Sequence, residues 1–397
     1  MKPLTFACLM LLCVTAVAKE DVKPGPDTVG AASAVVMDQK TRRVLWSKAM
    51  DARRYPASTT KIMSALLVAE KTKPSEVVSA PEGIEEVGES SLHLHSGEQL
   101  TSQDMLYAMM LRSANDACAT MAVHIAGSVP AFADMMNAKA KELGCTGTHF
   151  TNPHGLHDPQ HYTTAHDLAL IACAALDVPR VAETVKTQRH KVTRSSDSKD
   201  LTMVNRNRLL KDDPNCVGVK TGWTIPAGKC FVGAFEIGGR KIVTVVMGSQ
   251  DWMNDTSALE DWADHNIVDK IVAGAGQALG TATVKGGTAA EVKLQADKGA
   301  VIPWVAGQPF DAKPVAHAES VSAPVKAGQP MGTILMKLPD GTTVPVAVVA
   351  SVDVPAKPPI TNAINPGTFL VGGALVGGWA WTRSRQFRRR RPGVRRW

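Results

Sequence analysis

The chain has 397 residues, of which 44% are hydrophobic and 20% are charged, and this length predicts two domains with appended segments. Its formal net charge of +7 is concentrated at the C-terminus, because residues 382–397 contain eight arginines and no acidic residue, which leaves the rest of the chain at −1. The folded part therefore lacks the basic excess expected of a nucleic-acid-binding protein.

The N-terminal residues 1–18 have the composition of a signal peptide. Lys2 supplies the positive start, residues 4–14 form a short apolar core, and Ala16-Val17-Ala18 is a small-residue cleavage site. The alternative, a retained membrane anchor, is disfavoured because the apolar run is shorter than the roughly 20 residues that a spanning helix needs. The sequence therefore predicts an exported protein.

The composition of the C-terminal residues predicts that they attach the protein to a membrane. Residues 355–366 form a Pro-containing linker, residues 367–382 are apolar and glycine-rich, and residues 383–397 form the basic tail. Trp379 and Trp381 just before the arginines fit an aromatic belt and a cytoplasmic C-terminus. Because the segment would reach only about 24 Å as a helix, an interfacial segment and a disordered tail stay open as alternatives to a span.

The first predicted domain, residues 28–275, has strands at both ends and helices between them. β-branched and apolar runs predict strands at its start and its end, the last two joined by a turn at Gly238-Gly239. This order predicts a sheet assembled from distant segments and covered by a helical layer. The predicted strands are residues 31–38, 43–48, 217–220, 230–237 and 240–247, and the predicted helices are 62–69, 101–111, 116–125, 130–143, 164–176 and 259–275.

Two further regions differ from this pattern. Residues 74–100 are polar with several glycines, and we interpret them as a long excursion over a functional site, since loops of this length are usually lids or disordered. Residues 280–353 contain short β-rich runs separated by Gly and Pro, which predicts a small β-sandwich domain. No motif in this second domain carries chemistry.

The segment 55–63 contains the first chemical motif. Ser58 and Lys61 are three residues apart at the start of an almost wholly apolar segment, so both side chains are expected on one face at the positive end of a buried helix. A lysine serves as the base for a serine nucleophile only when burial and nearby positive charge lower its pKa from about 10.4. Ser-x-x-Lys alone is common by chance, and a capping serine with a surface lysine is the alternative.

Two later motifs change this interpretation. Ser113-Ala114-Asn115 and Lys220-Thr221-Gly222 follow Ser58 and Lys61 in the chain order typical of serine enzymes that react with penicillin. Together the three motifs predict an active site. No metal or other cofactor is expected: the histidines at 154, 157, 161 and 166 do not have the spacing of a zinc site, and the five cysteines beyond the signal peptide contain no Cys-x-x-Cys pair.

With these motifs, residues 31–353 resemble the low-molecular-weight penicillin-binding proteins, the serine-type D-alanyl-D-alanine carboxypeptidases. Segments 55–63, 111–119, 151–156, 205–210 and 218–228 carry the resemblance. It implies an α/β penicillin-recognising serine hydrolase domain, with an antiparallel sheet and helical layers, followed by a small β-sandwich. It also implies an outer-face location on the bacterial cytoplasmic membrane, in the periplasm or wall space, and two partners: peptidoglycan stems ending in D-Ala-D-Ala, and β-lactams.

The resemblance also implies a role for each motif residue. Ser58 attacks the carbonyl between the two D-alanines, Lys61 accepts its proton, and Ser113 relays a proton to the leaving D-alanine. Backbone N–H groups of Ser58 and Trp223 form the oxyanion hole. The substrate-binding residues are Asn115 for the amide, Lys220 for positive charge near Ser113, Thr221 for the carboxylate, and Gly222 for close approach of the peptide.

One departure from the family concerns the carboxylate anchor. Relatives often place an arginine after the hairpin, whereas this chain has no arginine between Arg240 and Arg383, and Arg206 is the candidate substitute. Three alternative functions stay open. A β-lactamase is disfavoured by the lack of a Glu-x-x-Leu-Asn run between Asn115 and Lys220, a DD-endopeptidase by the second domain, and an inactive wall-binding protein by the intact Ser58 and Lys61.

Overall fold

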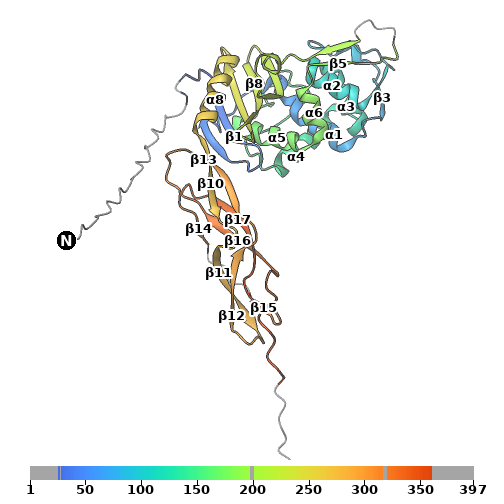
Figure 1. Cartoon of the computed structure of the whole chain (residues 1–397). Coiled ribbons are helices and arrows are strands. Elements are labelled where there is room, and N and C mark those ends of the chain that lie inside the picture. Colours follow the sequence, from blue (N-terminus) through green and yellow to red (C-terminus); the bar gives the residue numbers. More distant parts are fainter. Residues whose placement is uncertain (1–25, 27, 197–200, 316–319, 360–397) are drawn as a thin grey trace, which may run out of the picture. The chain divides into compact units, whose positions relative to one another are not determined.

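The computed structural model describes residues 26, 28–196, 201–315 and 320–359. The predicted signal peptide, membrane segment and basic tail, and the linker from residue 360 onward, lie outside these residues. The chain divides into two compact units (Figure 1). The first runs to Ala273 and includes residues 300–312 and 338–342, and the second comprises residues 274–299, 313–337 and those from Thr343 onward.

The first unit is built on an antiparallel five-stranded sheet with the order β2-β1-β9-β8-β7. The sheet joins the two ends of the unit, since β1 pairs with β9 from Ser33 opposite Met247 to Asp38 opposite Ile242. This confirms the prediction of a sheet gathered from distant segments. The strands are β1 Ser33–Asp38, β2 Val44–Lys48, β7 Cys216–Thr224, β8 Gly228–Ile237 and β9 Arg240–Ser249.

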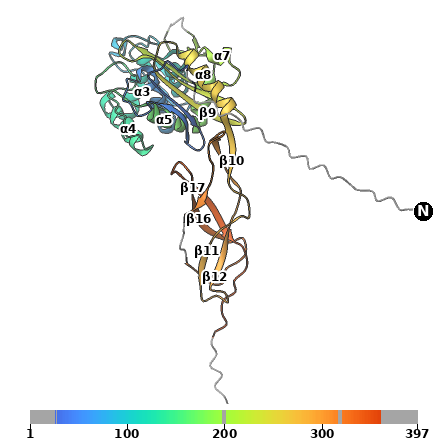
Figure 2. The same ribbon diagram turned by 90° about the vertical axis from the view of Figure 1, so that its left-hand side faces the viewer.

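Helices cover both faces of this sheet because alternate strand residues are apolar on both sides. Val35 and Val245 belong to a large core shared with the helices of the middle segment, whereas Val36 and Phe231 belong to a second core that includes residues of α8. Helices α5 and α8 both lie against β9 (Figure 2). Ser58 lies in η1, a single 3-10 turn, just before α1. The helices are η1 Ala57–Thr60, α1 Lys61–Lys71, η2 Ile84–Glu86, α2 Ser102–Tyr107, the π-helical η3 Ala108–Arg112, α3 Asn115–Ala126, α4 Val129–Glu142, α5 Ala165–Asp177, α6 Pro179–Lys186, α7 Leu209–Asp212 and α8 Trp252–Asn266.

The closing helix predicted over residues 259–275 is partly wrong. Helix α8 ends at Asn266, and the chain continues as strand β10 Ile267–Ala273, which pairs with β13 Ala300–Val305. The sequence of β10, Ile-Val-Asp-Lys-Ile-Val-Ala, is rich in β-branched residues, which favour an extended conformation when a partner strand is present.

The excursion over residues 74–100 is folded rather than open. Strands β3 Val77–Ser79 and β4 Gln99–Thr101 pair with each other. A second short pair, β5 Arg189–Lys191 and β6 Thr202–Val204, flanks Arg194. The Asp116 carboxylate accepts hydrogen bonds from the backbone N–H groups of Leu92 and Leu94, both at 3.0 Å. Buried Arg194 and Glu98 form a two-point ion pair at 2.6 and 2.8 Å. These contacts fix the segment beside α3.

The second unit is β-rich, as predicted, and its strands form one six-stranded sheet with the order β14-β16-β17-β12-β11-β15. Buried and exposed residues alternate along β11 and β16, so one face of the sheet supplies the core. Leu294 of β12 is fully buried. The strands are β11 Ala278–Lys285, β12 Glu291–Ala296, β14 Lys313–Pro314, β15 Ser320–Ser322, β16 Pro330–Lys337 and β17 Thr343–Ala350.

Candidate active site

The Ser58 and Lys61 side chains meet at the start of α1. The Lys61 ammonium lies 3.1 Å from Ser58 Oγ, and it also donates to Asn115 Oδ1 and to the His154 carbonyl, each at 2.7 Å. Lys61 is fully buried, and burial, with the charge of Arg206 contributing, lowers its pKa to about 8. A minor fraction of this lysine is therefore neutral near physiological pH, far more than a pKa of 10.5 would allow.

The backbone before Ser58 is held in an unusual conformation. Ala57 has φ of 48°, in the left-handed region that residues other than glycine rarely adopt. Gly155, with φ of 87°, packs directly against it: a Cβ at residue 155 would lie 1.8 Å from the Ala57 carbonyl oxygen. The serine turn thus depends on a glycine almost 100 residues away.

The histidine-rich loop supports this turn. His161 shares a 2.8 Å hydrogen bond with Thr60 Oγ1, and its Nδ1 accepts from the backbone N–H of Thr151 at 3.1 Å. Burial lowers the pKa of His161 to about 4 and that of His154 to about 3, so both imidazoles are neutral. The sequence analysis did not predict these supporting contacts, for which the Pro-His-Gly turn was the available signal.

The facing wall is formed where η3 ends and α3 begins. Ser113 adopts φ of 63° and Asn115 is the first residue of α3, and both are 2% exposed. The Asn115 side chain accepts from Lys61 and donates to the Gly88 carbonyl at 3.0 Å, while its backbone N–H donates to Ser90 at 2.7 Å. One amide N–H of Asn115 is left for a substrate.

Strand β7 closes the site along its free edge. Lys220 is buried and donates to the Thr221 carbonyl at 2.8 Å, and burial, together with the charges of Lys61 and Arg206, holds the pKa of Lys220 well below its usual range. A Cβ at Gly222 would lie 3.0 Å from the Ser58 backbone nitrogen, a tighter contact than most side chains make, so glycine favours this close approach. Trp223 is 62% exposed.

A cleft of about 730 Å³ opens above Ser58. The predicted residues Ser58, Arg206, Thr221, Gly222 and Trp223 line it, whereas Lys61, Ser113, Asn115 and Lys220 are buried around it. The prediction missed the remaining lining residues. They are Glu89, Ser90, Lys229, Cys230 and Trp252.

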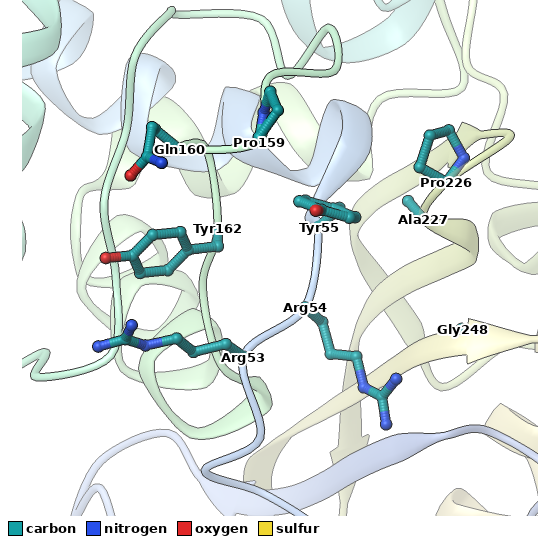
Figure 3. A pocket seen from close by; sticks show the side chains of 9 residues that line it. All are labelled: Arg53, Arg54, Tyr55, Pro159, Gln160, Tyr162, Pro226, Ala227 and Gly248. Atoms are coloured by element: carbon teal, nitrogen blue, oxygen red, sulfur yellow. The ribbon is translucent and has the colours of Figure 1, made fainter.

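A second hollow, of about 480 Å³, lies beside Tyr55 (Figure 3). Figure 3 shows that its two guanidinium groups point away from each other. Arg53 stacks over the Tyr162 ring at 4.6 Å, and Arg54 donates to Ser33 Oγ at 3.2 Å. Because these cations do not converge and Ser58 does not line the hollow, the reactive centre is the Ser58 cleft.

Comparison with known proteins gives the same assignment. Residues 19–251 match the peptidase S11 family, described as D-alanyl-D-alanine carboxypeptidase. The chain belongs to this family. It is 32% identical over 354 residues to the D-alanyl-D-alanine carboxypeptidase DacF of Bacillus subtilis, covering 86% of this chain and 90% of that protein. It is also 31% identical to DacC of Escherichia coli, covering 84% and 86%.

Solved structures confirm the fold class. Penicillin-binding protein 5 of Haemophilus influenzae superposes with a TM-score of 0.69 at 27% identity, covering 84% of this chain and all of that chain. The carboxypeptidase DacD of Francisella tularensis gives a TM-score of 0.64 at 25% identity, covering 85% and 96%. Within the described residues, no helix has the length and apolar character needed to cross a membrane.

Proposed function

We propose that this chain is a serine-type D-Ala-D-Ala carboxypeptidase that removes the terminal D-alanine from peptidoglycan pentapeptide stems, and that penicillin acylates the same serine. The observation that carries the proposal is the 3.1 Å contact between Ser58 Oγ and the buried Lys61 ammonium, whose pKa is lowered to about 8. Family membership supports the same reaction class.

In the acylation step, Ser58 Oγ attacks the carbonyl carbon between the two D-alanines while Lys61 takes the hydroxyl proton. Backbone N–H groups of Ser58 and Trp223 stabilise the oxyanion, a contribution of about 3 kcal/mol for each such donor. Ser113 gives its proton to the amide nitrogen and regains one from protonated Lys61, the C–N bond breaks, and D-alanine leaves. Neutral Lys61 then takes a proton from the water that attacks the ester, and returns it to Ser58 Oγ as the ester C–O bond breaks and the shortened stem leaves.

The other motif residues hold the substrate. Asn115 donates its remaining amide N–H to the stem peptide, and Lys220 adds positive charge beside Ser113. Thr221 binds the terminal carboxylate, and Gly222 lets the peptide lie against the edge of β7. Arg206 lines the cleft, and its charge adds to the effect of burial in lowering the pKa values of Lys61 and Lys220.

The proposal includes the organisation of the whole chain. Residues 1–18 direct export, residues 28–275 catalyse, and the β-rich residues 280–353 hold the catalytic domain away from the membrane. The linker 355–366, anchor 367–382 and basic tail 383–397 attach the protein to the outer face of the cytoplasmic membrane. Cell fractionation tests this: a chain ending at residue 366 should leave the membrane fraction, and retention of that chain there would contradict the anchor.

Release of D-alanine from a pentapeptide tests the activity, with Ser58→Ala as the control. The wild-type chain should release free D-alanine and the variant should not. Cleavage of cross-linked dimers without pentapeptide trimming would indicate the endopeptidase instead, and rapid turnover of penicillin would indicate a β-lactamase. Peptidoglycan binding without any of these three reactions would indicate the inactive wall-binding protein.

A further inference from the structure

Two cations line the cleft, and their positions differ. Arg206 and Lys229 share the cavity with Ser58, whereas Lys61 and Lys220 are buried around it. A substrate that ends in a free carboxylate needs a cation facing the open cleft, because burying an unpaired carboxylate is costly. The question is which of the two binds it.

Arg206 already has partners on one wall of the cleft. Its guanidinium donates to Ser90 Oγ at 2.8 Å and its backbone N–H donates to the Leu111 carbonyl at 3.2 Å. Arg206 is exposed, and its charge adds to the effect of burial, the main cause, in lowering the pKa values of Lys61 and Lys220. The Ser90 and Leu111 contacts hold Arg206 on that wall of the cleft.

Lys229 lies on the opposite wall, within the hairpin that contains Thr221. It stands directly opposite Trp223 in the β7–β8 ladder, while Thr221 stands opposite Phe231. Opposed residues share a sheet face, and so do residues two apart along one strand, so Thr221 and Lys229 lie on the same face as diagonal neighbours. The Cα atoms of such neighbours are about 7–8 Å apart, a distance that a lysine side chain spans.

The Lys229 ammonium is available for a ligand. Lys229 is exposed, and its Nζ donates to the Gln250 carbonyl at 2.5 Å, in the segment that follows β9. Among the described residues, no carboxylate lies within ion-pair distance of it. An ammonium has three N–H donors, so two are left for an anion in the cleft.

We propose that Lys229 binds the terminal carboxylate of the substrate together with the Thr221 hydroxyl, a role that rests on the proposed carboxypeptidase function. The Gln250 carbonyl orients the ammonium toward the cleft. Lys229 is a substrate-positioning residue, because it holds the carboxylate and takes no part in bond making. As a point charge on a flexible stem, it binds the carboxylate without the two-point geometry of an arginine.

The test compares two pentapeptide substrates, one ending in D-Ala-D-Ala as the free acid and the other as the amide, on the purified full-length chain. Lys229→Gln should raise the KM for the acid roughly 10- to 100-fold with little change in kcat, since a charge-assisted hydrogen bond of this kind is lost. The KM for the amide should be unchanged, and Lys229→Arg should restore preference for the acid.

Lys241→Gln is the matched control, because Lys241 lies in β9 of the same sheet outside the cleft lining, and its kinetics should equal wild type. Equal losses of Lys229→Gln on acid and amide, or no loss on either, would overturn the role of Lys229 while wild-type release of D-alanine still supports the carboxypeptidase. No release by the wild-type chain would overturn both proposals.

Discussion

The two units of the molecule differ in what they bury. The first unit buries charged side chains, among them Lys61, Lys220, Asp116 and the Arg194–Glu98 pair. In the described part of the second unit, the strands bury apolar side chains, as in β11 and β17. Buried charges destabilise a fold unless they are paired and hydrogen-bonded. Their concentration in the first unit indicates that the catalytic site, rather than stability, accounts for these buried charges.

The largest effect is expected at the base. Lys61→Met removes the proton acceptor of Ser58, and the rate of acylation by penicillin should fall about 10³-fold, within the range typical of general base catalysis. Stopped-flow fluorescence with a labelled penicillin measures this rate. Lys141→Met, at an exposed position of α4, is the control and should acylate at the wild-type rate. A fall of less than tenfold in Lys61→Met would contradict the base assignment.

A large effect on stability is expected at the buried ion pair. Arg194→Met leaves the Glu98 carboxylate, 1% exposed, without its partner, and the free energy of unfolding should drop by about 3–5 kcal/mol. Urea denaturation followed by circular dichroism measures the loss. Exposed Arg189→Met on β5 should change stability by less than about 0.5 kcal/mol. Equal stabilities of the two variants would show that the pair does not fix the excursion.

A tenfold effect is expected from pH. Lys61 must be neutral to accept a proton, and its pKa is lowered from 10.5 to about 8 by burial. The acylation rate should therefore rise as pH increases through 8, from pH 7 to a plateau roughly tenfold higher at pH 9. The residual rate of Lys61→Met should not show this rise. A wild-type rate that is level from pH 6 to 9 would contradict the lowered pKa.

The smallest effect on catalysis is expected from the second unit. Leu294→Ala leaves a cavity in its core and should destabilise that unit by about 2–5 kcal/mol, while the acylation rate stays within roughly twofold of wild type. Exposed Leu335→Ala on β16 is the matched control and should leave both unchanged. Calorimetry and acylation kinetics on the same samples measure the two effects. Loss of acylation in Leu294→Ala would show that the units are not functionally separate.

Much of the first unit was readable from sequence because its signals are local. The strand patterns predicted the sheet, and the three motifs predicted that Ser58, Lys61, Asn115 and Gly222 lie in one site. The missed features depend on pairing between distant residues. The register of β7 and β8 places Lys229 at the cleft. Bonds to distant residues, among them Asp116 and Arg194, fix the excursion.

The most direct test of the central claim, that Ser58 is the nucleophile activated by Lys61, is to locate the penicillin adduct by mass spectrometry of proteolytic peptides from the full chain. The account predicts one adduct, on the peptide that contains Ser58, and none in the Ser58→Ala variant. An adduct on another peptide, an adduct that persists in the variant, or no adduct on the wild-type chain would contradict it.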